Sequence, residues 1–337
     1  MPDPREFQIE TLEAGRSRLS YRPIESFQKS QEWITNYPQD LIRLILEIRG
    51  PASAIDEIRR EEDPHYVRAC LEKDILGYVD PVMLKGRRWL DFGCGGGAST
   101  MILARMFPDS PIIGLDLSDR SLEIAQARCI HYRYRNVEFR RSPSPDRLPE
   151  DIGTFDAILL SAVLEHLLPD ERRTLLPGLW GLLNPGGVLF IDQTPWRCFP
   201  FEGHTTRLPM LNYLPDRMAL AYARTFSRRV GSDESWQTLL RRGIRGASVR
   251  EIRRILRSSV DDIELLTPNR LGLRDRVDLW YAGYAVSISN KYGWARPIQE
   301  FLRWAFKAVY WFTGAAIVPS LSLALRKESG NRETDIL

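Results

Sequence analysis

Short apolar runs alternate with stretches of helical periodicity along the central part of the chain. The runs cover residues 90–92, 111–116, 155–161 and 188–192, and a further strand is expected at 137–140. Between the first three runs, residues 99–107 and 119–134 carry apolar side chains at helical spacing, and Ser118 stands where a helix cap is expected. Such alternation predicts a parallel sheet with helices on both faces, whose ligands bind outside the carboxyl ends of the strands.

The regions that flank this core are patterned differently. Residues 1–25 are polar and weakly patterned, which predicts an extended arm, and residues 25–50 show helical periods broken at Pro38. A helix over residues 64–79 is expected to lead into the first strand. Beyond the core, the pattern predicts a helix with a capping box from Ser248 to Glu251, a strand at 262–267, a helix at 297–312 and a strand at 320–325.

A glycine-rich bend follows the first strand, in the segment from Leu90 to Ala98. Its glycines, Gly93, Gly95 and Gly97, let the backbone turn sharply and approach a ligand. The helix that follows presents free N–H groups and a positive dipole end to that ligand. The spacing also fits a dinucleotide fingerprint, but Asp91 would repel a pyrophosphate there, whereas it can face a cationic ligand. A glycine turn with only a packing role is the alternative.

Further motifs follow the bend in a fixed order. Asp116 ends the second strand about twenty residues past the bend, where an acid reaches ribose hydroxyls. Leu164, Glu165 and His166 follow the fourth strand, and residues 184–187 (Asn-Pro-Gly-Gly) turn into the fifth. Together these motifs resemble the class I S-adenosylmethionine (SAM)-dependent methyltransferases, especially the small-molecule branch that includes the ubiquinone-type enzymes. The resemblance covers residues 64–195 well and 248–327 loosely.

The resemblance implies a Rossmann-like α/β fold with a seven-stranded, mostly parallel sheet, a helical N-terminal leader and a helical lid insertion after strand five. We expect an arm and leader at 1–80, a SAM-dependent methyltransferase domain at 81–327 with an insertion at 193–247, and a disordered tail at 328–337. SAM is the implied cofactor. Its implied contacts are Asp91, Gly93, Cys94, Gly95, Gly97, Asp116, Leu117, Ser142, Pro143, Ser161, Ala162 and His166. Many relatives carry Asp near Ser142, so Ser142 either replaces it at adenine or belongs to a proline turn without ligand contact.

Residues 193–247 form a long insertion rich in aromatic and polar side chains, and we expect it to form the acceptor pocket and its lid. His204 is the preferred general base, because a pair with Glu202 would orient and strengthen it. A loop histidine bonded to backbone is the alternative there. His166 is the second candidate, beside a structural or cofactor-contacting role. The expected substrate-binding residues are Trp196, Arg197, Glu202, Thr205, Asn212 and Tyr213. No cluster shows metal-ligand spacing, so a metal-independent reaction is expected.

The amino-acid composition excludes some classes of protein and suggests no further function. The chain has 337 residues, of which 43% are hydrophobic and 27% charged, with a net charge of +3. These values are ordinary for a globular protein and do not favour nucleic acid as a partner. Four scattered cysteines, without CxxC spacing, argue for a reducing compartment and against a disulfide framework or zinc site. The polar start shows no signal-peptide pattern, so a cytoplasmic protein is expected.

Two segments keep a membrane surface under consideration. Residues 224–257 hold ten arginines and three acids, which form either a solvated helical face or a surface for the phosphates of a substrate, an anionic membrane or RNA. Residues 308–325 carry no charge, but Gly314 and Pro319 interrupt this run, and 320–325 alternates as a strand does. A helix and a strand are therefore favoured over a membrane span. The aromatic helix before the strand could still lie on a membrane surface.

Three functions remain in competition. The first is methyl transfer to a small-molecule acceptor, with oxygen as the favoured nucleophile. The second is methyl transfer to a lipid or lipid-linked substrate at a membrane surface. The third is a non-enzymatic SAM-binding module or an RNA methyltransferase, for which no appended RNA-binding module is recognisable. A small-molecule acceptor is thus the expected partner and nucleic acid is not, while a peripheral membrane contact and a homodimer stay open.

Overall fold

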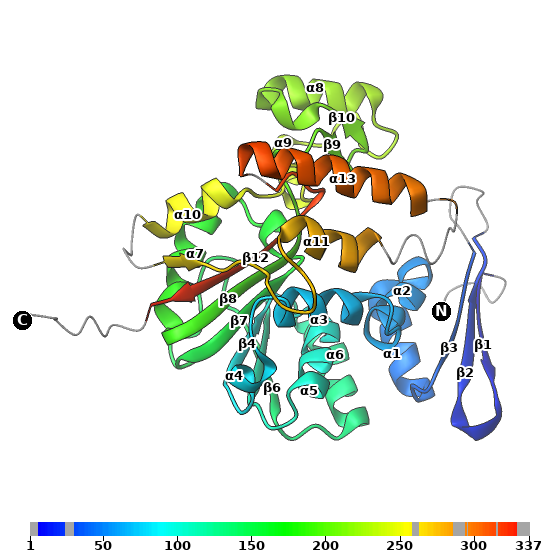
Figure 1. The fold of residues 1–337 in the computed structure, drawn as a ribbon. Coiled ribbons are helices and arrows are strands. Elements are labelled where there is room, and N and C mark those ends of the chain that lie inside the picture. The colour runs from blue at the N-terminus through cyan, green and yellow to red at the C-terminus, as the bar shows by residue number, and fades with distance from the viewer. Residues whose placement is uncertain are drawn as a thin grey trace, which may run out of the picture.

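The computed structural model describes residues 6–23, 30–257, 263–285, 294, 296–314 and 316–328. Seven strands form the central sheet in the order β11-β12-β8-β7-β4-β5-β6 (Figure 1). They are β4 (Trp89–Phe92), β5 (Ile112–Asp116), β6 (Val137–Arg141), β7 (Phe155–Ser161), β8 (Leu183–Pro195), β11 (Ile263–Leu265) and β12 (Ser320–Lys327). Strands β4 to β8 pair in parallel, whereas β12 is antiparallel to both of its neighbours. The Rossmann-like, mostly parallel sheet predicted from the sequence is confirmed.

Two apolar cores lie on the two faces of this sheet. Successive side chains of a strand point to opposite faces, so Leu90 and Phe92 enter one core while Trp89 enters the other. The Trp89 core is completed by α3 (Val67–Leu76) and α5 (Ala98–Met106), and the Leu90 core by α7 (Pro169–Leu182) and α10 (Val249–Arg257). The sheet is therefore covered on both faces, and its ligand-binding edge is left to the loops.

Both expected helix caps are present. Helix α6 (Asp119–Tyr132) begins after Ser118, whose hydroxyl accepts the N–H of Ser121 at 3.2 Å. The hydroxyl of Ser248 accepts the N–H of Glu251 at 3.2 Å at the start of α10. A short helix, α4 (Pro81–Leu84), precedes the first strand of the sheet. These local signals are strong because each side chain satisfies a helix N–H that has no partner within the helix.

The extended arm expected at residues 1–25 is wrong for the described part of that segment. Strands β1 (Phe7–Thr11), β2 (Ser17–Tyr21) and β3 (Gln31–Thr35) form an antiparallel sheet joined in part by the turn η1 (Glu13–Gly15). Trp33 and Ile34, which were expected on a helix, lie in β3. Alternate residues of β2 are buried, and one of them is a serine, so the short period-two signal is masked in the sequence by polar composition.

Two helices connect this small sheet to the core of the fold. Helix α1 (Gln39–Arg49) begins directly after Pro38, as predicted, whereas α2 (Pro51–Glu62) was not anticipated. Helix α2 buries three apolar residues, Ala54, Ile55 and Ile58. The arginine and glutamate residues beside them made the apolar pattern hard to recognise in the sequence. These residues join Leu19 of β2 in a third apolar core. The leader is therefore packed rather than extended.

The insertion after β8 has a small core of its own. It contains β9 (Phe201–Glu202), β10 (Leu208–Pro209), η3 (Leu211–Tyr213), α8 (Asp216–Phe226) and α9 (Trp236–Arg241). In Figure 1, α8, β9 and β10 lie together at one end of the molecule, beyond α13 (Arg296–Thr313). The buried guanidinium of Arg245 donates to the carbonyl oxygens of Leu211 and Leu214 and pairs with Asp216, so this arginine holds the insertion together.

The C-terminal region returns the chain to the sheet. It contains α11 (Arg276–Trp280), the π-helical turn η4 (Tyr281–Ala285), α13 and β12. The uncharged run at 308–325 divides between the end of α13 and β12, as the alternating pattern predicted. Among the described residues, no helix has the length and apolar character needed to cross a membrane. The tail expected at 328–337 lies outside the described residues apart from Glu328.

Candidate active site

The glycine bend after β4 has a backbone that only glycine adopts readily. Gly93, Gly95 and Gly97 have φ angles of 74°, 54° and 81°, all in the left-handed region. A Cβ on Gly93 would lie 2.5 Å from a methyl carbon of Val163, and one on Gly97 would lie 2.8 Å from the Cβ of Ala125. The bend therefore requires glycine both for its conformation and for the close approach of its neighbours.

Two carboxylates hold the bend. Asp91 is 1% exposed, and it accepts hydrogen bonds of 2.6 Å from the hydroxyls of Ser99 and Thr100. Burial raises the pKa of Asp91 to about 6, against the lowering effect of those hydroxyls. Asp116 accepts the N–H of Gly95 at 2.9 Å. A positive charge favours the ionised form of a nearby carboxyl group, so a cationic ligand in this place would lower the pKa of Asp91.

A cavity of about 370 Å³ opens beside the bend, which is a size typical of small-molecule sites. One wall is the bend itself together with Ser161 and Ala162 at the end of β7. The other wall was missed from the sequence, because the helix that carries most of it was not anticipated. That wall consists of Arg49, Ser53, Asp56, Glu57, Arg60 and Val67.

Arg128 joins the unanticipated wall to the bend. Its side chain is fully buried, and it donates to the carbonyl oxygen of Gly96 at 2.6 Å and to the carboxylate of Glu57 at 2.9 Å. Burial alone would raise the pKa of Glu57, but Arg128 and Arg49 outweigh it and hold that pKa below its ordinary value. The ion pair between Arg128 of α6 and Glu57 of α2 therefore closes the cavity on this side.

The expected cofactor contacts divide into two groups. Gly93, Cys94, Gly95, Ser161 and Ala162 line the cavity beside the bend. The others lie around it: Gly97 caps α5, Asp91 and Asp116 support the bend, Leu117 is 42% exposed, and Pro143 is exposed. The hydroxyl of Ser142 donates to the carbonyl oxygens of Ser144 and Arg147 at 3.0 and 2.9 Å. Of the two alternatives for Ser142, this geometry favours the turn.

A second cavity, of about 320 Å³, lies at the end of β8. Its side chains include Gln193, Trp196, Phe199, His204 and Trp280. The side-chain amide of Gln193 donates to the hydroxyl of Ser161 at 3.2 Å, so the second cavity meets the first at this contact. Both Ala162 and Gln193 have positive φ angles, 54° and 57°, and such strained backbone concentrates at functional sites.

The expected acceptor residues are only partly gathered around this second cavity. Trp196, Glu202 and Asn212 line it together with His204. The remaining three residues make contacts within the surrounding loops: Arg197 pairs through its backbone with Ala247, Thr205 donates to the carbonyl of Arg242, and Tyr213 donates to the carbonyl of Cys198.

The expected pairing of the His204 imidazole with Glu202 is wrong. The Glu202 carboxylate is buried and accepts the backbone N–H groups of His204, Thr205 and Thr206 at 3.0, 2.9 and 2.6 Å. The three consecutive N–H groups lie in a tight turn and need an acceptor, because no strand or helix supplies one. Glu202 is therefore a capping group for the loop and does not orient the ring.

The imidazole of His204 faces His166 instead, with ring centroids 5.7 Å apart. Glu165 lies next to them, 1% exposed, and accepts a hydrogen bond of 3.0 Å from the hydroxyl of Thr194. Burial raises the pKa of this carboxyl group, against the two imidazoles. Sequence spacing gave no sign of this cluster, because the insertion folds back over η2 (Leu164–His166) only in three dimensions.

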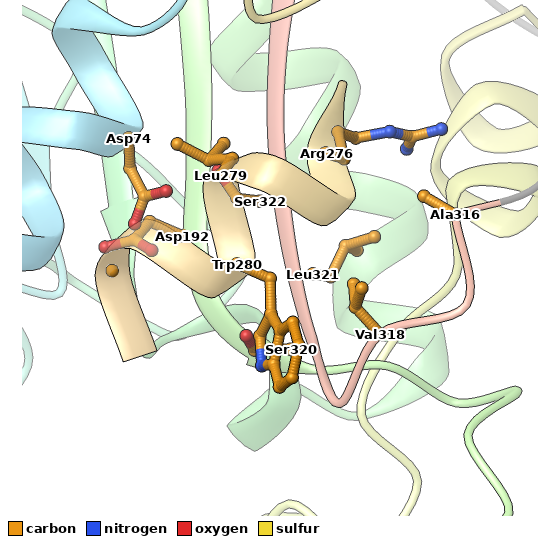
Figure 2. Close-up of a pocket in the computed structure, with 11 residues that line it drawn as sticks. Asp74, Asp192, Arg276, Leu279, Trp280, Ala316, Val318, Ser320, Leu321 and Ser322 are labelled. Carbon is orange, nitrogen blue, oxygen red and sulfur yellow. The ribbon is translucent and has the colours of Figure 1, made fainter. Parts of the chain in front are cut away.

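A buried pair of carboxyl groups lies on the other side of Ser161. Figure 2 shows Asp74 of α3 and Asp192 of β8 with their carboxyl groups toward each other, beside Trp280 and Ser320. Burial raises the pKa of Asp74 strongly, and Asp192 adds to this effect. Asp192 also accepts from Ser161 and Gln193 at 3.3 and 3.1 Å. The space around the pair is about 10 Å³, room for about one water molecule.

Known proteins match the region that contains the glycine bend. Residues 90–189 match the model of a methyltransferase domain family. The chain is 44% identical over 104 residues to trans-aconitate 2-methyltransferase of Methylobacterium radiotolerans, covering 31% of this chain and 36% of that protein. It is 34% identical over 131 residues to the mitochondrial ubiquinone biosynthesis O-methyltransferase of Homo sapiens, covering 37% of this chain and 34% of that protein.

Solved structures of methyltransferases are also similar. A putative sarcosine dimethylglycine methyltransferase from Galdieria sulphuraria shares 15% identity, with a TM-score of 0.44, over 83% of this chain and 87% of that chain. The chain spans about a third of the length of the curated relatives described above. Residues 90–189 therefore form a methyltransferase domain of the class I, SAM-dependent type. The cofactor of this domain is SAM.

Proposed function

We propose that the protein transfers a methyl group to a small-molecule acceptor, with an oxygen atom as the nucleophile. The observation that carries this proposal is the contact between Ser161 and Gln193, which joins a cavity at the glycine bend to a second, aromatic cavity. Methyl transfer needs a donor and an acceptor held in line at close distance, and positioning supplies much of the rate. Two cavities that share one contact meet this requirement.

The first cavity suits SAM, which supplies the methyl group when bound. The left-handed bend leaves open space where a Cβ on Gly95 would stand, and Asp91 and Asp116 provide negative charge for a cationic ligand. In this proposal Asp91 favours the ammonium and sulfonium charges, Asp116 remains able to accept from ribose hydroxyls, and the wall from α2 excludes water. The negative charge also disfavours the pyrophosphate of a nicotinamide cofactor.

The second cavity suits an acceptor with an apolar, planar body. Trp196, Phe199 and Trp280 supply aromatic surface, and Gln193 and His204 supply polar groups at its edge. In this proposal His204 takes the proton of the acceptor hydroxyl, with His166 beside it as the second candidate. Residues 81–327 then act as the methyltransferase domain, and residues 193–247 as its acceptor-binding lid. The favoured oxygen nucleophile agrees with the name of the human relative, an O-methyltransferase.

Calorimetry with SAM, its demethylated product S-adenosylhomocysteine and NADH tests the first half of the proposal. We expect binding of the first two at one site per chain and none of NADH. Radiolabelled methyl transfer to a panel of hydroxylated aromatic, quinol-like and sugar acceptors tests the second half. His204→Ala is expected to lose turnover and retain SAM binding. Binding of NADH without binding of SAM would contradict the proposal.

A second candidate function is methylation of a lipid at an anionic membrane surface. Helix α13 exposes five large apolar side chains by 53–79%: Ile298, Phe301, Trp304, Trp311 and Phe312. A wide cavity of about 860 Å³ between α10 and the segment after α13 is lined by Arg250, Arg253, Arg254, Arg257 and Arg276, together with Trp196 of the acceptor side. Aromatic and cationic groups on one surface are typical of helices that lie in a lipid interface.

Flotation with vesicles separates the two functions. If the lipid function holds, the protein floats with vesicles rich in phosphatidylglycerol and not with phosphatidylcholine vesicles, and Trp304→Ser together with Trp311→Ser abolishes flotation. Absence of flotation with anionic vesicles would leave the small-molecule function alone.

A further inference from the structure

Three side chains, two from the turn after β7 and one from the insertion, converge at the edge of the acceptor cavity. One potential ligand atom from each of Glu165, His166 and His204 lies within 4.8 Å of the other two. Glu165 and His166 belong to η2, whereas His204 comes from the turn between β9 and β10 and also lines the acceptor cavity. Ligand atoms about 2.1 Å from a tetrahedral zinc ion lie about 3.4 Å apart, so the cluster needs to close by about 1.4 Å at most.

The two imidazoles are oriented by consecutive backbone carbonyl groups at the end of α9. Nδ1 of His166 lies 2.7 Å from the carbonyl oxygen of Arg241, and Nδ1 of His204 lies 3.1 Å from that of Arg242. A carbonyl oxygen can only accept, so Nδ1 carries the proton in both rings, and Nε2 of the neutral ring keeps its lone pair. Histidines that bind metals usually donate their other ring N–H in this manner.

Glu165 supplies an oxygen that lacks a hydrogen-bond donor. Its side chain is fully buried, and Oε2 is fixed by the hydroxyl of Thr194. The other oxygen, Oε1, has no hydrogen-bond partner among the described residues and lies 3.8 Å from Nε2 of His166. A buried carboxylate oxygen without a donor is unfavourable unless a positive charge lies beside it. This oxygen is therefore available to a cation.

A glycine beside the cluster lets two of its members lie close together. Gly243 has a φ angle of 88°, and a Cβ there would lie 2.9 Å from Cε1 of His204 and 3.1 Å from Cγ of Glu165. The absence of a side chain at this position therefore allows the imidazole and the carboxylate to approach each other.

We propose that Glu165, His166 and His204 bind one divalent transition-metal ion of the zinc type at the edge of the acceptor cavity. Two imidazole nitrogens and one carboxylate oxygen suit such an ion, whereas magnesium and calcium prefer oxygen ligands. Three protein ligands leave a coordination position open. That position adjoins the acceptor cavity, where the ion would bind an acceptor oxygen and ease the loss of its proton to water. With the ion bound, His204 is a ligand, and the ion replaces it as the group that activates the acceptor. This last role rests on the proposed function, whereas the ion site itself does not.

Metal titration of the full chain after removal of metal with a chelator tests the site directly. Zn²⁺ is followed by calorimetry and Co²⁺ by visible absorption, which reports on the coordination of the ion. We expect one ion per chain, and we expect His204→Ala and Glu165→Gln each to weaken binding about tenfold or more. His65→Ala, at an exposed histidine on the leader, is the matched control and should bind as the unmodified chain does.

SAM binding by the same protein separates the possible failures. Retained SAM binding in His204→Ala shows that the variant is folded. If the unmodified chain binds SAM but neither ion, or if both cluster variants bind the ions as the unmodified chain does, the metal site is overturned while the proposed function stands. If the ions bind as expected but SAM does not, the proposed function fails and the metal site stands.

Discussion

The guanidinium group of Arg128 donates a hydrogen bond of 2.6 Å to the carbonyl oxygen of Gly96 while it pairs with Glu57 at 2.9 Å. Arg128 belongs to α6, Gly96 to the glycine bend and Glu57 to α2, so one buried cation joins three separate segments of the chain. The shape of the cofactor cavity therefore depends on a contact that lies behind its wall, and this dependence can be measured.

Arg128→Met should strongly destabilise the protein. The substitution leaves the Glu57 carboxylate without its buried partner, and breaking a buried pair in this way costs about 3–5 kcal/mol. Urea unfolding measures this loss, and SAM affinity should fall with it. Arg120→Met is the control on the same helix, because Arg120 and Glu47 pair with side chains 53% and 67% exposed. The control should change stability by less than about 1 kcal/mol. Equal effects of the two substitutions would contradict the bracing role of Arg128.

Gly93→Ala should reduce SAM affinity at least about tenfold, since the new Cβ would meet Val163 at 2.5 Å and the backbone is left-handed. Isothermal calorimetry measures the change. Gly181→Ala, within α7, is the matched control because a Cβ there meets nothing within 4 Å. This control should keep SAM affinity and stabilise the helix by up to about 1 kcal/mol. Undiminished SAM binding by Gly93→Ala would exclude the bend as the cofactor cradle.

SAM affinity should decrease as the pH falls below about 6. The pKa of Asp91 in the free protein is raised from 3.8 to about 6 by burial, and a cationic ligand lowers it again by favouring the carboxylate. Below pH 6 the ligand must expel a proton to bind, so affinity drops by up to about tenfold per pH unit. Asp91→Asn should bind SAM weakly and without this pH dependence. A flat profile between pH 5 and 7 in the unmodified chain would remove Asp91 from the binding step.

The same raised pKa affects the stability of the ligand-free protein in the opposite direction. Between pH 3.8 and about 6 the folded state binds more protons at Asp91 than the unfolded state does. The contribution of this group to the free energy of unfolding therefore falls as the pH rises through this interval. Comparing urea midpoints of the unmodified chain and Asp91→Asn at pH 5 and pH 7 isolates this contribution.

Leu19→Ala should destabilise the protein by about 2–5 kcal/mol, the usual cost of emptying a buried leucine site. Leu19 is fully buried in the third core with Ile42 and Ile55. Thermal or urea unfolding measures the loss. Arg18→Ala, at the neighbouring half-buried position of β2, is the control and should change stability by about 1 kcal/mol or less, because the side chain of its partner Glu10 is 60% exposed. A small effect of Leu19→Ala would contradict the packed leader and support the extended arm that the sequence predicted.

Local pattern and local chemistry were enough to predict most of the sheet and the bend. Four of the five parallel strands of the core are buried on both faces and read as mainly apolar runs, whereas β6 is partly exposed. Gly93 and Gly97 could be recognised because left-handed backbone selects one residue type. The leader could not be predicted in the same way. Leu19 lies in a five-residue strand whose neighbours are polar, and five of the twelve residues of α2 are arginine or glutamate.

What the sequence by itself determined is the α/β sheet, the glycine bend with Asp91, and the resemblance of this domain to class I SAM-dependent methyltransferases, because each follows from neighbours along the chain. Only the tertiary structure decided which groups meet across the insertion. It separated the ring of His204 from Glu202, two residues away, and placed it beside Glu165, 39 positions earlier. The reason is physical: a buried carboxylate takes whichever donors the folded chain brings to it, and distance along the sequence does not measure that distance in space.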